Sequence, residues 1–234
     1  MATESIDGEA AAGEPVNHPR EGSPRGGAES TSRQRAGRSW LALVIFFSMT
    51  LTIFAADQAL KYLTFNTPAV AGQPIQINAN QPKQTFIPPH SRVTVVPHLL
   101  SLKLTMNTGA VFGLGDGWQW FFIAISILAV GVLLRLFWVS PANAWPTHLA
   151  LALILAGDLG NLYDRLMFHA VRDMLLLFPG VPLPFGLRWP QGHDGLFPWV
   201  FNIADAALLT GVALVLVIIW NNERPPQNAQ SSQR

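Results

Sequence analysis

Apolar residues are concentrated in four long runs, separated by segments that are richer in polar residues. The runs cover residues Trp40 to Leu63, Trp118 to Val139, Thr147 to Tyr163 and Pro198 to Trp220. A helix needs about 20 apolar residues to cross the hydrocarbon layer of a bilayer, and each run is close to that length. The pattern therefore predicts four transmembrane helices. The third is short and ends in glycine and polar residues, so we expect its outer end to be buried in protein.

Apolar and polar residues alternate in part of the segment between the first two runs, which is the pattern of β-strands. The alternation has apolar positions at Val93, Val95, Leu100, Leu102 and Leu104. We expect a small β-sheet on the membrane surface here, preceded by a flexible insertion at 66–91. Residues 178–197 are rich in proline, glycine and tryptophan, as is typical of an interfacial loop. The predicted fold class is an all-α membrane protein with four transmembrane helices, a small extracytoplasmic β-element and an interfacial loop.

The two ends of the chain lack large apolar side chains. We expect a disordered tail at 1–38, a membrane domain at 39–222 with its outer loop and β-element at 64–117, and a short tail at 223–234. Three arginines precede the first run closely, at Arg33, Arg35 and Arg38. Positive charge near a membrane helix marks the cytoplasmic side. Both termini of this multi-pass chain are therefore expected in the cytoplasm, with the large loops and polar motifs on the outer face.

Composition supports a membrane protein and excludes several kinds of partner and site. The chain is 50% hydrophobic and only 12% charged, whereas soluble domains are about a quarter charged. Its net charge of +1 provides no basic surface for nucleic acid. There are no cysteines, which excludes disulfides, thiolate nucleophiles and zinc–thiolate sites.

Aspartates are the most informative polar residues of the membrane domain. Seven acidic residues lie between Ser39 and Asn222, and all seven are aspartates. An ionisable group at a membrane segment indicates a functional site. Asp173 and Asp205 lie beside the third and fourth runs, and two neighbouring carboxylates share one proton. Such a pair suits aspartic proteolysis, although either residue alone would read as a helix cap or an ion-pair partner.

Other polar residues lie at helical spacing near the same ends. Asn161, Asp164 and Arg165 share one helical face, and we expect Asp164 to form an ion pair with Arg165. Asp57 and Lys61 are four residues apart, which predicts an ion pair at the membrane edge with the Lys61 side chain reaching toward water.

Asn107 and Gly109 precede the second run. Gly109 permits close backbone approach and Asn107 can hydrogen-bond an extended chain, although spacing alone indicates a simple turn. The chain has no HExxH or GxSxG motif, so neither a zinc protease nor a serine hydrolase is predicted.

Together these motifs resemble the bacterial lipoprotein signal peptidase family, also called signal peptidase II. The resemblance covers about Ser39 to Asn222 and is carried, in the family's order, by four motifs: Asp57-Gln-Ala-Leu-Lys61, Asn107-Thr-Gly-Ala-Val-Phe112, Gly160-Asn-Leu-Tyr-Asp-Arg165 with Val171-Arg-Asp173, and Phe201-Asn-Ile-Ala-Asp205. The sequence departs from the family pattern at Asp158 and at His169-Ala170, and its loops 66–91 and 178–197 are longer.

The resemblance implies an aspartic endopeptidase of the bacterial inner membrane. Such enzymes remove the signal peptide from a prolipoprotein, cutting just before a cysteine that carries diacylglycerol. It assigns catalysis to Asp173 and Asp205, and gives substrate-site or supporting roles to the remaining motif residues: Asn107, Gly109, Asn161, Arg165, Asn202, Asp57, Lys61 and Asp164. It also implies contact with membrane lipid, inhibition by globomycin-type peptides, and no metal or organic cofactor. We expect a monomer, because one chain supplies both carboxylates.

Two other functions remain open from the residues alone. A small ion- or proton-coupled transporter could use Asp57, Asp164 and Asp205 as a relay, although four helices without an internal repeat are few for a carrier. A catalytically inactive relative, kept for binding, would tolerate changes of aspartate to asparagine.

Overall fold

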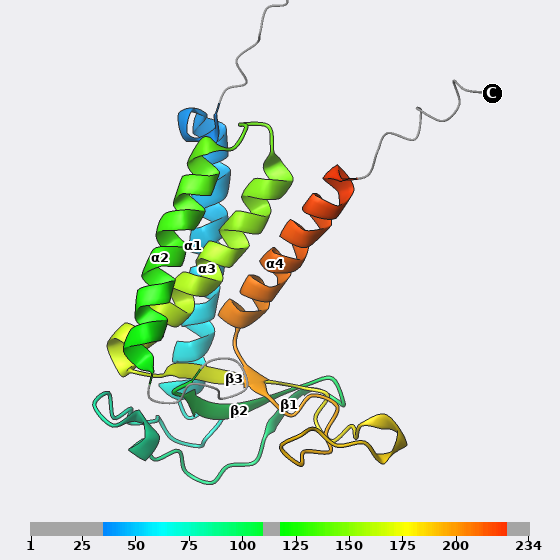
Figure 1. Ribbon diagram of the computed structural model, residues 1–234. Helices are drawn as coiled ribbons and strands as arrows, with labels where there is room; N and C mark the ends of the chain where they lie inside the picture. Colours follow the sequence, from blue (N-terminus) through cyan, green and yellow to red (C-terminus); the bar gives the residue numbers. More distant parts are fainter. Residues whose placement is uncertain (1–34, 110–117, 224–234) are drawn as a thin grey trace, which may run out of the picture. The chain divides into compact units, whose positions relative to one another are not determined.

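The computed structural model describes residues 35–109 and 118–223, and long helices dominate this part of the chain (Figure 1). The helices are α1 (Trp40–Phe65), α2 (Gln119–Val139), α3 (Trp145–Phe168) and α4 (Ile203–Asn222). Most of both expected tails, and residues 110–112 of the second motif, lie outside the described residues. Among the described residues, the short helix η1 (Ala36–Arg38) lies inside the expected tail 1–38, where Ala36 is buried and its backbone N–H donates to Ser140.

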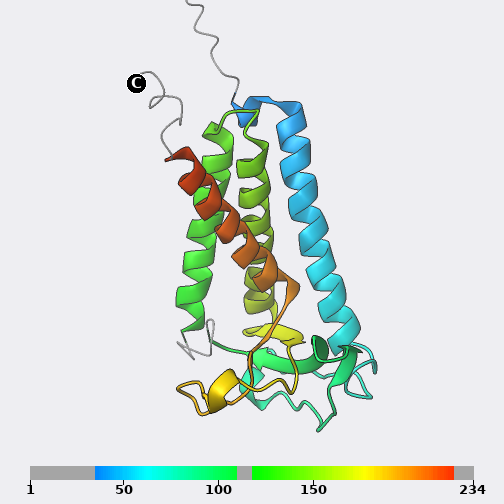
Figure 2. The same ribbon diagram turned by 90° about the vertical axis from the view of Figure 1, so that its right-hand side faces the viewer.

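Helix α3 is the most buried of the helices and packs against the other three. Figures 1 and 2 show α1, α2 and α3 running side by side, with α4 inclined across α3. Glycines allow α3 and α4 to approach closely. A Cβ at Gly157 would lie 2.3 Å from the carbonyl oxygen of Ala204, and one at Gly211 would lie 2.7 Å from that of Ala150. Small residues serve membrane helix packing in this way, and here they bring the start of α4 against α3.

Three helices of the described chain are long and apolar enough to cross a membrane: α1, α2 and α4. Their outer faces expose large apolar side chains, with Leu51 66%, Leu128 67% and Leu216 62% exposed. Exposing so much apolar surface to water is unfavourable, whereas the hydrocarbon of a bilayer accommodates it. The chain is therefore a membrane protein. The predicted four helices are present, but α3 carries too many polar residues to meet the same criterion, and its crossing of the membrane stays a prediction.

Helix α3 is longer than predicted. It continues past Tyr163 to Phe168 and ends at His169, whose backbone is left-handed with φ 55°. The extra turn is possible because its polar side chains Asn161, Asp164 and Arg165 bond within the protein.

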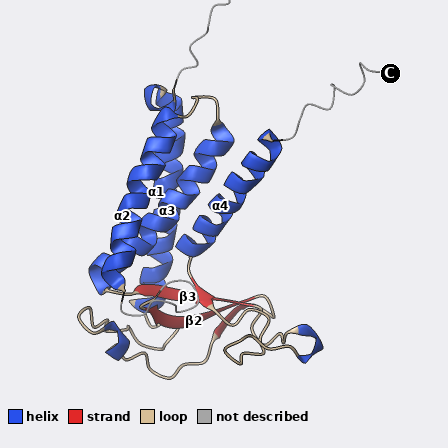
Figure 3. Cartoon of the chain, viewed as in Figure 1, coloured by secondary structure: helices blue, strands red, loops and turns tan. Residues whose placement is uncertain are grey.

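A four-stranded antiparallel sheet lies at one end of the helices, as Figure 3 shows. Its strands follow the order β1 (Val93–Val96), β2 (Leu100–Asn107), β3 (Val171–Leu177) and β4 (Val200–Phe201). The first two were predicted and are confirmed. The other two were missed: the first four residues of β3 are all buried, so the strand lacks the alternation of a half-exposed one. Residues 198–202 were assigned to the fourth helix, which instead begins at Ile203.

The insertion 66–91 has little regular structure beyond η2 (Pro82–Gln84), but it is anchored to the sheet side of the protein. Its Val70 and Ile75 are buried in a core cluster with Phe65, Leu104 and Met174. The Ile75 backbone N–H also donates to Phe65 at 2.7 Å. Residues 178–197 include the short helix η4 (Pro184–Gly186), and the ring of Trp189 in this segment packs edge to face against the ring of Trp199.

Candidate active site

Asp173 lies in β3, paired with Thr105 of β2, and is only 1% exposed. The strand turns its carboxylate toward two side-chain amides. Asn107 Nδ2 donates to one oxygen at 3.1 Å, and Asn202 Nδ2 donates to the other at 2.7 Å. The candidate carboxylate is thus held at both oxygens by residues from two other elements.

Asp205 lies in the first turn of α4, where Asn202 caps the helix. The Asp205 backbone N–H donates to Asn202 Oδ1 at 2.9 Å, and the Asn202 backbone N–H donates back to Asp205 Oδ2 at 3.2 Å. This reciprocal capping box fixes both side chains. Because the Nδ2 of the same Asn202 also bonds Asp173, this residue contacts both candidate carboxylates.

Asn161 of α3 completes the arrangement. Its Nδ2 donates to Asp205 Oδ1 at 2.8 Å, and its Oδ1 accepts from Asn202 Nδ2 at 3.1 Å. Three asparagines therefore connect the carboxylates of Asp173 and Asp205, which come from distant parts of the sequence, into one hydrogen-bonded cluster.

Burial, and after it the neighbouring charge of Asp205, raise the pKa of Asp173 to about 8. The amide hydrogen bonds from Asn107 and Asn202 and the charge of Lys61 oppose this rise in pKa but are smaller. Near neutral pH, Asp173 therefore holds a proton. A carboxylic acid beside a second carboxylate can serve as a hydrogen-bond donor to a substrate.

A network of buried charges lies behind the carboxylates. Lys61 Nζ is 2.7 Å from Asp57 Oδ2 and 3.1 Å from Asp164 Oδ2. Arg172 meets the same Asp164 through Nη2, at 2.8 Å, and through Nε, at 3.3 Å. The formal charges, two positive and two negative, cancel, which is how charge is tolerated away from water.

Two sequence-based predictions about these charges were wrong. Lys61 does pair with Asp57, but its side chain is fully buried and does not reach toward water. Asp164 pairs with Lys61 and Arg172 and not with the adjacent Arg165. Successive residues on a helix point in different directions, so Arg165 faces elsewhere.

Asp57 connects this network to α4. Its Oδ1 accepts from the backbone N–H of Ala204 at 2.9 Å, one residue before Asp205. Gly160 allows the approach, because a Cβ there would lie 2.8 Å from Asp57 Oδ2. The carboxylate thus satisfies an N–H group of the first helical turn, where negative charge is stabilised.

Arg165 lies on the α2 side of α3. Its Nη2 donates to the Gly109 carbonyl at 3.4 Å, and its guanidinium lies 5.4 Å from the centre of the Phe122 ring. The Gly109 N–H in turn donates to Asn107 Oδ1 at 3.1 Å. These bonds hold residues 107–109 beside Asp173.

Two polar residues near the site were not singled out from the sequence. Arg172 precedes Asp173 and also donates to Gln58 Oε1 at 2.9 Å, while Gln58 Nε2 donates to the Gly160 carbonyl at 3.3 Å. Arg172 and Gln58 both lie inside recognised motifs. Their positions next to Asp173 and Asp57 in the sequence were the signal that could have identified them as site residues. Asp158, a departure from the family pattern, is buried in α3, and its Oδ2 has no hydrogen-bond partner among the described residues.

The arrangement offers acid–base chemistry from a carboxylate pair. Within the described residues, no group of three or more His, Cys, Asp or Glu side chains is placed to hold a metal ion. An ionised and a protonated carboxyl group held together are suited to activating a water molecule while polarising a carbonyl group.

Comparison with known proteins gives consistent matches. The family model described as signal peptidase (SPase) II matches residues 49–221. The lipoprotein signal peptidase of Latilactobacillus sakei subsp. sakei (strain 23K) is 38% identical over 131 residues, covering 56% of this chain and 76% of the relative. That of Desulfitobacterium hafniense (strain DSM 10664 / DCB-2) is 32% identical over 138 residues, covering 59% and 80%. A bacterial membrane enzyme solved by the in meso method at 2.3 Å resolution is similar in structure, with a TM-score of 0.56 and 25% identity over 78% of this chain and 93% of that one.

Proposed function

The chain belongs to the signal peptidase II family and is a membrane peptidase, and we propose that it is an aspartic endopeptidase acting on prolipoproteins. Its substrate is a prolipoprotein whose cysteine carries diacylglycerol, and it cuts just before that cysteine. The observation that carries the aspartic mechanism is the position of Asn202, which bonds Asp173 through its side chain and Asp205 through a capping box.

The two carboxyl groups have different tasks in this mechanism. The raised pKa of Asp173, about 8, keeps it protonated, so it donates to the oxygen of the scissile carbonyl. The ionised Asp205 takes a proton from water, and the water oxygen attacks the carbonyl carbon. The tetrahedral intermediate then releases the amine of the cysteine, which leaves with the proton held by Asp205. Asp173 keeps its proton as the carbonyl re-forms.

The surrounding residues support this chemistry by position. Asn107 and Asn161 each hold one carboxylate and retain amide groups that can bind an extended peptide. Arg165 fixes the backbone at Gly109, close to where the peptide would lie. Asp57, Lys61 and Asp164 serve as scaffold, because their charges are satisfied by one another and by the first turn of α4.

The placement of the site suits a substrate that emerges from a membrane. Asp173 lies in the sheet, and Asn202 and Asp205 lie at the start of α4 next to it. Figure 3 shows this sheet at one end of the helices, where an apolar signal peptide and two acyl chains would stay beside the apolar helices. We place this end on the outer face of the bacterial inner membrane, with both termini in the cytoplasm and α3 as the fourth crossing. The enzyme acts as a monomer on this account, contacts membrane lipid and is inhibited by globomycin-type peptides.

The family match favours a peptidase over the transporter and the inactive relative. The described aspartates at the site also lie together at one end of the helices, whereas a relay through the membrane needs groups along its depth.

The test is cleavage of a purified prolipoprotein by the full chain in detergent or nanodiscs. Two substrates of identical sequence are compared, one carrying diacylglycerol on its cysteine and one unmodified, and mass spectrometry identifies the products. We expect the modified substrate alone to be cut, directly before the cysteine. Equal cleavage of both substrates, or a cut elsewhere, would contradict the proposed specificity.

A further inference from the structure

Residues 182–195 form a hairpin that projects from the sheet between β3 and β4. Pro182 and Gly195 pair at its base as an isolated antiparallel bridge. The Leu183 N–H donates to the Asp194 carbonyl at 2.6 Å. In Figure 1 the hairpin lies to one side of the sheet, beyond the base of α4. It is therefore an ordered element of the fold, close to the end of a membrane helix.

The tip of this hairpin exposes apolar side chains. Phe185 is 96% exposed and Leu187 is 59% exposed. The backbone at Phe185 is left-handed, with φ 59°, and Gly186 follows with φ 68°. A left-handed backbone is unfavourable for a bulky residue, and strain of this kind is concentrated at functional positions. The chain thus keeps a phenylalanine ring away from the rest of the protein at a cost in free energy.

Hydrogen bonds around Trp189 support the tip. The Trp189 N–H donates to the His193 carbonyl at 2.8 Å, and its carbonyl accepts from the Gly192 N–H at 2.7 Å. The indole Nε1 donates to the Gly195 carbonyl at 3.0 Å. These three bonds fix the second half of the hairpin, so the exposed apolar residues are carried on an organised support.

A chain of aromatic rings connects the hairpin to the base of α4. Trp189 meets Trp199 with ring centres 4.6 Å apart. Phe197 lies between Trp199 and Phe201, with ring centres 5.4 Å and 5.9 Å away. Phe201 is two residues before Ile203, where α4 begins, and α4 is apolar enough to cross a membrane. Tryptophan is enriched where a membrane meets water, so these rings continue the lipid-facing surface of α4 to the hairpin.

The charges of the hairpin are compatible with a lipid surface. Its charged side chains are Arg188 and Asp194, and it also carries His193. Arg188 follows Leu187 directly. An arginine in this position reaches lipid phosphate groups while its apolar neighbour lies deeper.

We propose that this hairpin is a membrane anchor, with Phe185 and Leu187 inserted into the leaflet on the sheet side and Arg188 among the headgroups. The anchor fixes the junction of β4 and α4, where Asn202 and Asp205 lie, relative to the bilayer surface. The inference needs only that α4 lies in a membrane, and it does not depend on the proposed peptidase reaction.

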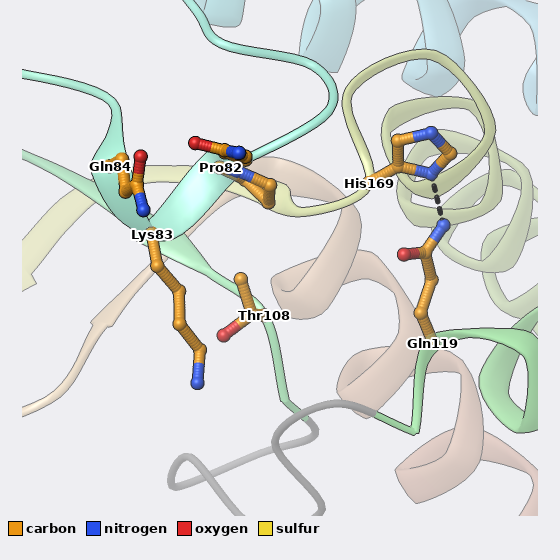
Figure 4. A pocket seen from close by; sticks show the side chains of 7 residues that line it. Pro82, Lys83, Gln84, Thr108, Gln119 and His169 are labelled. Atoms are coloured by element: carbon orange, nitrogen blue, oxygen red, sulfur yellow. Dashed lines mark hydrogen bonds between the residues drawn. The ribbon is translucent and has the colours of Figure 1, made fainter.

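The insertion, which also lies on the sheet side, offers a polar control. Its residues 78–84 contain no large apolar side chain. Within them, η2 lines a cavity of about 280 Å³ together with Thr108, Gln119 and His169, and Figure 4 shows that most of the lining side chains are polar. Asn80 is exposed in this stretch, so a probe placed there reports on a surface that we expect to face water.

The experiment uses the absence of cysteine from the chain, because one introduced cysteine then carries a fluorophore at a single position. The full chain is labelled at Phe185→Cys, at Asn80→Cys and, as a lipid-facing reference, at Leu216→Cys on α4, where the native side chain is exposed. Each protein is placed in nanodiscs of phosphatidylethanolamine and phosphatidylglycerol. Quenching by lipids with a nitroxide on the acyl chain is compared with quenching by iodide in the water.

We expect the label at Phe185 to be quenched by the lipid nitroxide, like the label at Leu216, and the label at Asn80 to be quenched by iodide. A label at Phe185 that behaves like the one at Asn80 would overturn the inference.

A second label tests which side chains cause the insertion. Pro184→Cys places the fluorophore next to Phe185 and leaves both apolar residues in place. We expect its quenching by the lipid nitroxide to be lost when Phe185→Ser and Leu187→Ser are combined, while quenching at Leu216→Cys stays unchanged in the same double variant. Lipid quenching at Pro184→Cys that survives the double substitution would overturn the assignment of these two residues as the anchor.

Discussion

Replacing Lys61 by methionine tests the buried charge network most sharply. The substitution keeps the length and most of the volume of the side chain but removes its charge. Lys61 is fully buried, with Nζ 2.7 Å from Asp57 and 3.1 Å from Asp164. Asp164 would keep Arg172, whereas Asp57 would keep only the Ala204 N–H and the Gln58 amide.

Removing one partner of a buried ion pair destabilises a protein by about 3–5 kcal/mol, because the other charge stays buried without compensation. We expect Lys61→Met to lower the free energy of unfolding by this amount. Adding Asp57→Asn to Lys61→Met removes the stranded charge, so the double variant should recover about 1–3 kcal/mol relative to additivity.

The assay is reversible unfolding in mixed micelles, followed by the fluorescence of the eight tryptophans. Lys103→Met is the control, because Lys103 is exposed and its loss should change stability by less than about 0.5 kcal/mol. A loss below about 1 kcal/mol in Lys61→Met, or strict additivity with Asp57→Asn, would refute the interpretation of Lys61 as the central counter-ion.

Three further predictions use the same preparation. Gly157→Ala should lower the free energy of unfolding by about 1–3 kcal/mol, because the added Cβ would lie 2.3 Å from the carbonyl oxygen of Ala204. Gly131→Ala on α2 is the control. Nothing lies within 4 Å of its added Cβ, so it should raise the free energy of unfolding by up to about 1 kcal/mol. The pKa of Asp173, raised to about 8, makes its contribution to stability complete below about pH 4 and lost as the pH rises through 8. The unfolding free energy should therefore fall over this window, and Asp173→Asn should flatten the stability profile. The cleavage rate depends on protonated Asp173 in the folded protein, so its fall should be centred near pH 8. Asn202→Ala should lower stability by at least about 1 kcal/mol and reduce cleavage more than tenfold, and a normal rate would remove Asn202 from the account.

The helices were predictable because the signal for each one lies within its own segment of the sequence. A run of about 20 apolar residues predicts a helix surrounded by lipid, and the alternation at Val93 and Leu102 predicts strands with one exposed face. Strand β3 was missed for the complementary reason, since Val171 to Met174 are buried throughout and show no alternation. The start of α4 was placed too early because only the capping geometry of Asn202 marks it.

The site was predictable in its members but not in its pairings. Motifs identified Asp173, Asp205 and the asparagines, and spacing identified the Asp57–Lys61 pair. Spacing also suggested that Asp164 pairs with Arg165, whereas its partners come from α1 and β3. Contacts between elements depend on how the chain is packed, and no rule of residue spacing along a helix contains that information. The cavity beside Thr108 was hidden for the same reason, because the insertion meets the ends of α2 and α3 only in the folded protein.

Catalysis by the two carboxylates is tested by the initial rate at which Asp173→Asn and Asp205→Asn proteins cleave a diacylglyceryl-modified prolipoprotein. Asp194→Asn is the matched control, because Asp194 lies exposed in the loop 178–197. We expect each of the first two substitutions to lower the rate by about 10²- to 10⁴-fold while the protein stays folded, and we expect Asp194→Asn protein to cleave normally. Near-normal cleavage by either Asp173→Asn or Asp205→Asn would contradict a mechanism based on this pair of carboxylates.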